Sequence, residues 1–110
     1  MAPRLTLYWR PGCPFCTSLS TSLARLGVPF REVDVWEDPE ASTFVRSITG
    51  GHETVPTVVV GDVPLVNPTV HDIMAVAASE APELVPDDYE PPQPSRFGRW
   101  LRDKLGAAGA

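Results

Sequence analysis

The first third of the chain passes from a strand pattern to a helix pattern and back. The apolar run over residues 5–9 predicts a buried strand. Leucines at helical spacing then predict a helix over residues 14–26, with Gly27 as its C-terminal stop. Valines that alternate with acidic residues predict a second strand over residues 31–36. These three elements form a β-α-β unit.

The middle of the chain predicts a second helix followed by a hairpin. Asp38 and Pro39 suit the N-cap and the first position of a helix that closes at a Gly-Gly pair. Two valine-rich runs, residues 57–60 and 63–66, are separated by a Gly-Asp pair that fits a type II′ turn. Pro64 marks the second run as an edge strand, because proline has no N–H to donate to a neighbouring strand.

The last predicted helix has two candidate starts. One is Asn67 before a proline, and the other is Thr69 with Asp72 three residues later, which is the spacing of a capping box. The sequence leaves both open. Apolar residues recur at helical spacing after them, so the predicted order is β-α-β-α-β-β-α and the fold class is α/β.

Composition divides the chain into three parts. Residues 1–79 carry the predicted elements and form one domain. Residues 80–94 are rich in proline and acidic residues, and we expect an extended linker without packed structure. Residues 95–110 hold a basic amphipathic segment with Trp100 and other apolar residues on one face. Such a segment is suited to docking on a protein or an anionic membrane. Folding back onto an apolar patch of the same domain is the open alternative.

Charge follows the same division. Residues 1–94 hold five arginines against thirteen acidic residues, whereas residues 95–110 hold four cations and one acid. The acidic body argues against nucleic-acid binding, which needs a basic surface. No apolar run approaches the length of a membrane span, and the N-terminal residues lack a signal-peptide layout. We therefore expect a cytoplasmic protein.

Cys13 and Cys16 are the only cysteines, and they lie between the first predicted strand and the first predicted helix. The first thiol then sits at a helix N-terminus, where the dipole and the unpaired N–H groups favour the reactive thiolate. Pro14 suits the first helical turn, where its missing N–H costs nothing. The pair predicts redox chemistry, with Cys13 exposed and Cys16 one turn deeper.

Two structural roles compete with redox chemistry at this pair. A zinc half-site would need further ligands, and His52 and His71, nineteen residues apart, lack the close spacing of a second ligand pair. We therefore expect no metal. A purely structural disulfide would close so short a loop that it would stabilise the fold only weakly.

Three stretches of the sequence together resemble a known family. They are Arg-Pro-Gly-Cys-Pro-Phe-Cys at residues 10–16, Thr-Val-Pro-Thr at residues 54–57 and Asn-Pro-Thr at residues 67–69. On these, residues 4–79 resemble the glutaredoxin branch of the thioredoxin superfamily, and most of all the actinobacterial mycoredoxins. The resemblance implies a thioredoxin-like fold, in which a four-stranded mixed sheet is flanked by helices.

The resemblance also implies how the site is built. Cys13 would be the nucleophile and Cys16 its redox partner. A cis-proline at Pro56 would lie opposite Cys13 and present the backbone of Val55 to the thiol substrate. Arg10, three residues before Cys13, is a candidate to stabilise the thiolate by its charge.

Five further residues are candidate substrate contacts. Trp9 and Phe15 flank the cysteine pair as flat apolar groups. Asn67, Thr69 and Asp72 stand where glutathione-using glutaredoxins carry a Gly-Gly-x-x-Asp stretch. Because that stretch is replaced here by a form similar to that of the mycoredoxins, mycothiol is favoured over glutathione as the co-substrate.

The expected activity is therefore that of a thiol–disulfide oxidoreductase. It would reduce mixed disulfides between proteins and a low-molecular-weight thiol, with no tightly bound cofactor, and we expect a monomer. Two other roles stay open. One is a dithiol electron donor to ribonucleotide reductase or another reductase, and the other is a non-enzymatic iron-sulfur carrier or scaffold.

Overall fold

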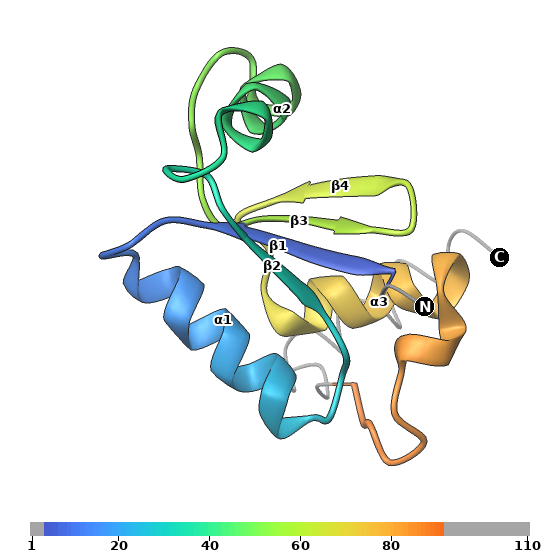
Figure 1. Ribbon diagram of the computed structural model, residues 1–110. Helices are drawn as coiled ribbons and strands as arrows, with labels where there is room; N and C mark the ends of the chain where they lie inside the picture. The colour runs from blue at the N-terminus through green and yellow to red at the C-terminus, as the bar shows by residue number, and fades with distance from the viewer. Residues whose placement is uncertain (1–3, 92–110) are drawn as a thin grey trace, which may run out of the picture.

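The computed structural model describes residues 4–91, in which a four-stranded mixed sheet has helices on both faces (Figure 1). In chain order the elements are β1 (Leu5–Trp9), α1 (Pro14–Arg25), β2 (Arg31–Asp34), α2 (Pro39–Thr49), β3 (Thr57–Val60), β4 (Val63–Val66), α3 (Val70–Glu80) and the short 3₁₀ helix η1 (Pro82–Leu84). The predicted β-α-β-α-β-β-α order is confirmed.

The sheet places the ends of three strands close together. Its strand order is β2-β1-β3-β4, with β1 parallel to β2 and antiparallel to β3. Trp9 at the end of β1 lies opposite Asp34 at the end of β2, and Tyr8 lies opposite Thr57 at the start of β3. The segments that leave β1 and β2 and the segment that enters β3 therefore meet at one end of the sheet. As predicted, Pro64 lies on an edge strand.

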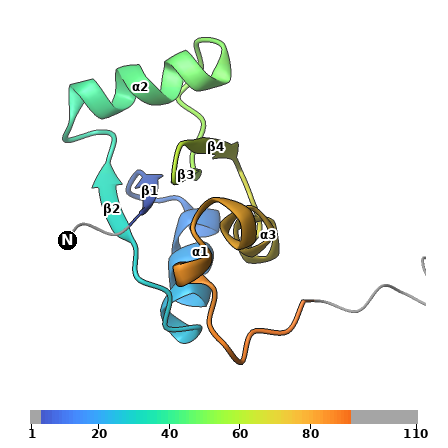
Figure 2. The same cartoon turned by 90° about the vertical axis from the view of Figure 1, so that its right-hand side faces the viewer.

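The two faces of the sheet carry cores of different size. Helices α1 and α3 cover one face, and α2 covers the other (Figures 1 and 2). The larger core joins buried leucines of β1 and α1 to residues of β3 and α3; among them are Leu5, Leu7, Leu19, Leu23, Val58, Val60, Ile73 and Met74. The smaller core consists of Val35, Ala41 and Val45, and Val55 packs against it.

The second strand is shorter than the sequence predicts. It ends at Asp34 instead of Trp36, because the chain turns there. One carboxylate oxygen of Asp34 accepts a hydrogen bond from the Trp36 N–H at 2.9 Å, and its carbonyl accepts one from Asp38 at 3.1 Å. An Asp side chain that binds the backbone two residues ahead is typical of a turn and competes with strand pairing.

Several predicted helix and turn signals are confirmed. The Asp38 side chain caps α2 by accepting two backbone N–H groups, and Gly50 ends that helix in the left-handed conformation at φ 78°. Gly61 has φ 59° in the β3–β4 turn, whereas Asp62 has no positive φ, as in a type II′ turn. These local choices agree with the global fold.

The start of α3 is resolved in favour of Thr69. Its side chain accepts the Asp72 N–H, and the Asp72 carboxylate accepts the Thr69 N–H at 2.9 Å, so both halves of a capping box are present. Asn67 lies two residues before this cap with φ 50°. Its N–H binds the Pro56 carbonyl at 2.8 Å, which ties the start of α3 to the segment before β3.

The Asp72 carboxylate gives the helix start a dependence on pH. Hydrogen bonds from the backbone and the side chain of Thr69 hold the pKa of Asp72 below its ordinary value. The stabilisation is therefore complete above the ordinary Asp pKa of about 3.9 and is lost as the pH falls through the lower native value. We expect Asp72→Asn to unfold more easily than the parent at neutral pH, with the difference vanishing in acid.

Urea unfolding of both proteins across the acid range checks this expectation. Thr69→Ala is the companion variant, because it removes the other half of the cap and should cost about 1 kcal/mol at neutral pH. A constant gap between Asp72→Asn and the parent down to the lowest pH would contradict the assigned role of the carboxylate.

The segment after α3 differs from the expectation for residues 80–94. Ala81 and Leu84 are buried in the larger core, and Val85 and Tyr89 pack against it. The expectation of a linker without packed structure is therefore wrong for residues 81–89, because apolar residues placed between its prolines and acids extend the core. The end of that predicted linker and the basic segment over residues 95–110 lie outside the described residues.

No helix within residues 4–91 combines the length and the apolar character needed to cross a membrane.

Candidate active site

Cys13 is the N-cap residue of α1. Its backbone is extended, with φ −97° and ψ 102°, and its sulfur accepts the Cys16 N–H at 3.2 Å. Its carbonyl accepts the Thr17 N–H, which begins the helical hydrogen-bond pattern. The sulfur therefore lies where the helix presents free N–H groups and the positive end of its dipole. Both features favour a negatively charged sulfur.

Cys16 lies one turn deeper and pairs with Cys13. The two sulfurs are close to a disulfide, and the Cα atoms are 5.3 Å apart. Cys16 is only 3% exposed, whereas Cys13 is half-buried. Cys13 is thus less open than the sequence predicts, but it is the sulfur that a substrate can reach.

The segment before β3 faces Cys13 from the other side. The Val55–Pro56 peptide bond is cis, as the family resemblance implies, and Pro56 is buried. The Val55 carbonyl oxygen lies 4.0 Å from the Cys13 sulfur. The Thr57 hydroxyl donates to the Thr54 carbonyl at 2.7 Å, which closes the turn around this bond.

A groove of about 380 Å³ runs beside the cysteine pair, between α1 and the start of α3. Its lining residues are Phe15, Ser18, Leu19, Ser22, Pro56, Asn67, Pro68, Thr69 and Val70. Four of the predicted substrate contacts therefore line the same groove: Phe15, Pro56, Asn67 and Thr69. The Phe15 side chain is 69% exposed. None of the lining side chains is charged.

Comparison with known proteins decides the family. Residues 5–65 match the family model for glutaredoxins. The chain belongs to the glutaredoxin family. With a Cys13–Cys16 pair at a helix start, this glutaredoxin is a thiol–disulfide oxidoreductase.

Its relatives include actinobacterial proteins. It is 38% identical over 72 residues to an inferred glutaredoxin of Mycobacterium tuberculosis, covering 64% of this chain and 86% of the relative. It is 35% identical to mycoredoxin 1 of Corynebacterium glutamicum, covering 64% and 89%. Among solved structures, the glutaredoxin-like NrdH-redoxin of Escherichia coli is 28% identical with a TM-score of 0.51, covering 57% of this chain and 80% of that one. The fold is thioredoxin-like, as predicted.

The other predicted contacts lie outside the groove of this glutaredoxin. Trp9 is half-buried and lines a smaller pocket of about 160 Å³ with Cys16 and Glu32. Arg10 is exposed on the loop before Cys13. Asp72 lines a different groove, on the outer side of α3, and its carboxylate is occupied by the helix cap. Asp72 is thus bonded to Thr69 in the helix cap but does not line the groove with Phe15 and Asn67.

Five of the lining residues were not predicted as substrate contacts, and two of these five, Ser18 and Ser22, carry hydroxyl groups. Ser18 and Ser22 line the groove on α1, one turn apart and on the same side as Phe15. Their signal in the sequence is a set of small polar residues at helical spacing after the cysteine pair. Such a face supplies hydroxyl groups to a ligand without adding charge.

The histidines take no part in this site. Nδ1 of His71 lies 2.7 Å from the Tyr89 hydroxyl, and His52 is exposed in the α2–β3 loop. Across residues 4–91, no three His, Cys, Asp or Glu side chains gather in a way that could hold a metal ion.

Proposed function

We propose that this glutaredoxin reduces mixed disulfides between proteins and a low-molecular-weight thiol, with mycothiol as the preferred co-substrate. The observation that carries the proposal is the position of the Cys13 sulfur. It accepts an N–H at the start of α1 and lies 4.0 Å from the Val55 carbonyl oxygen, and Phe15 and Pro56, which are close to these two residues in the chain, line the uncharged groove. A cytoplasmic setting, where thiols are kept reduced, fits this role.

The reaction proceeds by thiolate exchange. The Cys13 thiolate attacks the small-thiol sulfur of the mixed disulfide, and the protein leaves as a thiolate that takes a proton from water. A second small thiol then attacks the sulfur attached to Cys13, which yields a disulfide of two small thiols and restores the Cys13 thiolate. Alternatively, Cys16 attacks the Cys13 sulfur, releases the small thiol and forms the Cys13–Cys16 disulfide. Each route transfers two electrons to the substrate.

The groove supports the choice of small thiol. Glutathione carries two carboxylates and an ammonium group, whereas mycothiol is an uncharged cysteinyl sugar with many hydroxyl groups. The groove offers the side chains of Ser18, Ser22, Asn67 and Thr69 and no charged group. Buried or half-buried charges need charged partners, whereas hydroxyl groups are satisfied by neutral donors and acceptors.

A reductant comparison tests the proposal. One mixed-disulfide substrate is reduced with mycothiol or with glutathione, and Cys13→Ser protein serves as the blank. We expect kcat/KM to be at least about tenfold higher with mycothiol, which corresponds to about 1.4 kcal/mol of preferential binding. Equal or higher turnover with glutathione would contradict the assignment of the co-substrate.

A dithiol electron donor is the second candidate. The observation that favours it is the structural likeness to NrdH-redoxin, whose described activity profile is thioredoxin-like. A donor to ribonucleotide reductase or another reductase would need both cysteines and would be re-reduced by a flavoprotein. Adding a thioredoxin reductase with its reduced cofactor as a third arm of the same assay separates this role from the small-thiol route.

Docking through the basic segment over residues 95–110 remains a proposal based on sequence alone, as does the monomeric state. The segment combines Phe97, Trp100 and Leu101 with four cations, which suits an acidic protein surface or an anionic membrane.

A further inference from the structure

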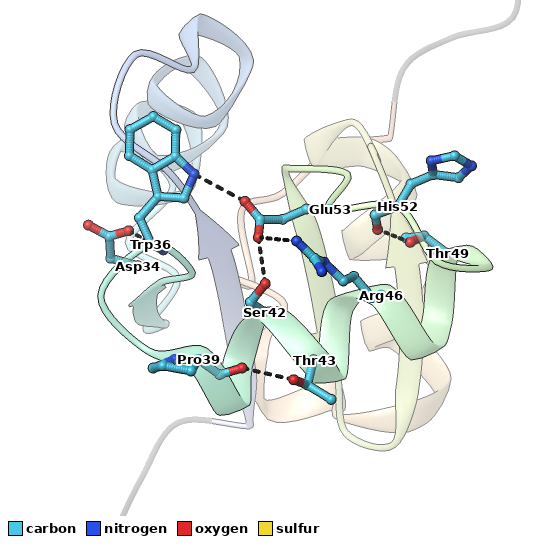
Figure 3. A network of polar contacts seen from close by, with 9 residues as sticks. All are labelled: Asp34, Trp36, Pro39, Ser42, Thr43, Arg46, Thr49, His52 and Glu53. Atoms are coloured by element: carbon cyan, nitrogen blue, oxygen red, sulfur yellow. Dashed lines mark hydrogen bonds and ion pairs between the residues drawn. The ribbon is translucent and has the colours of Figure 1, made fainter.

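Glu53 joins three parts of the chain just before the segment that faces Cys13. It lies in the loop between α2 and β3 (Figure 3). One carboxylate oxygen accepts the Trp36 indole N–H at 3.1 Å, and the other accepts the Ser42 hydroxyl and lies 3.7 Å from Arg46. The Glu53 side chain is 17% exposed, compared with 57% for Arg46. The carboxylate is thus a largely buried charge with a full set of partners.

The partners of Glu53 attach its loop to α2 and to the turn after β2. Ser42 and Arg46 belong to α2, and Trp36 belongs to the turn after β2. Glu53 precedes Val55 by two residues, a distance of at most about 7 Å along an extended chain. The Val55 carbonyl, which lies 4.0 Å from the Cys13 sulfur, is therefore close in the chain to this anchored side chain.

Other contacts also hold this segment. Directly before Glu53, the Thr49 hydroxyl binds the His52 carbonyl, and further contacts hold the far end. The Thr57 hydroxyl binds the Thr54 carbonyl, and the Asn67 N–H binds the Pro56 carbonyl. The Val55 side chain rests on the smaller core beneath α2. This core consists of three buried residues, so it resists displacement of the segment less than the larger core would.

We propose that Glu53 is a positioning residue, which sets the place of the Val55 main chain relative to Cys13 and so governs how well a disulfide substrate is aligned for attack. The inference rests on the proposed exchange reaction at Cys13. Glu53 touches neither substrate nor sulfur and acts through the loop, so it should affect the alignment of large disulfides and leave the intrinsic reactivity of the thiolate unchanged.

The test uses the Cys16→Ser chain, in which only the Cys13 exchange step remains. The reduced protein reacts with a peptide that carries a mixed disulfide to glutathione or to mycothiol, and the release of the peptide thiol gives a second-order rate. Alkylation of Cys13 by iodoacetamide, a small reagent that needs no alignment, is measured in parallel. We expect Glu53→Ala to slow peptide release about tenfold, as displacement of a reacting group does, and to leave alkylation unchanged.

Four further variants sharpen the result. Glu53→Gln keeps an acceptor for Trp36 and a polar partner for Ser42, so it should restore most of the rate. Glu37→Ala removes an equal charge from the exposed loop before α2 and should have no effect. Ser42→Ala and Trp36→Phe each remove one bond to Glu53 and should show smaller losses; they carry the test if Glu53→Ala does not fold.

The outcomes are distinguishable. Unchanged peptide release in Glu53→Ala, or in the two single-bond variants if that protein does not fold, overturns the inference. Equal slowing of release and alkylation also overturns it, because the thiol itself would then be altered. If the parent chain exchanges with neither peptide, the proposed function fails and the positioning role falls with it.

Discussion

Cys13→Ser should reduce turnover of mixed disulfides by more than about 1000-fold, as loss of a nucleophile does in other enzymes, whereas Cys16→Ser should retain it with a small thiol as reductant. Only the Cys13 sulfur lies at the helix start and within reach of a substrate, while Cys16 is 3% exposed. In Cys16→Ser, a second small thiol from solution still completes the cycle. Steady-state assays with a peptide mixed disulfide measure both effects.

The two variants are matched controls for each other, because each removes one sulfur and adds one hydroxyl. In the same assay with a flavoprotein reductase instead of a small thiol, neither variant should be active, since that route needs both cysteines. A Cys13→Ser protein that keeps its turnover while Cys16→Ser loses it would reverse the roles assigned to the two sulfurs.

Leu84→Ala should lower the free energy of unfolding by about 2–5 kcal/mol. Leu84 is 4% exposed and lies in the larger core, although it belongs to the proline-rich segment after α3. Truncation removes buried methyl groups and leaves a cavity, and both effects destabilise the folded state. Urea unfolding should show a lower midpoint with an unchanged slope.

Glu83→Ala is the matched control for this change. Glu83 is the neighbour of Leu84 in the sequence and makes only an exposed ion pair with Arg4, at 3.3 Å. Such pairs contribute about 0–1 kcal/mol. A Leu84→Ala loss no larger than that of Glu83→Ala would show that residues 81–89 do not belong to the cooperative core.

The order of elements could be predicted because local signals and the global fold agree. Apolar spacing located the strands and helices, and the Asp38 cap and the Gly61 turn act within a few residues of themselves. The end of β2 could not be predicted from alternation alone, because Asp34 captures the backbone of the following turn. Leu84 was obscured by its prolines and acids, since burial depends on which surface is left uncovered by α1 and α3.

The site, like the fold, could be predicted only in part from the sequence. The sequence predicted the Cys13–Cys16 pair and the cis bond at Pro56, and the structure places them close together. The groove combines residues of α1 with those before α3, and only the fold shows that Asp72 turns away from it while Ser18 and Ser22 line it. Glu53 gives no sequence signal, because its partners are 7, 11 and 17 residues distant.

The most direct test of the account is competitive labelling of the reduced, full-length protein with iodoacetamide at about pH 6. That pH lies well below the usual thiol pKa of about 8.5, so only a sulfur stabilised as thiolate reacts quickly. Peptide mass spectrometry then locates the label. The position of Cys13 at the start of α1 predicts fast labelling of Cys13 and slow labelling of Cys16. Faster labelling of Cys16 would contradict the assignment of Cys13 as the nucleophile.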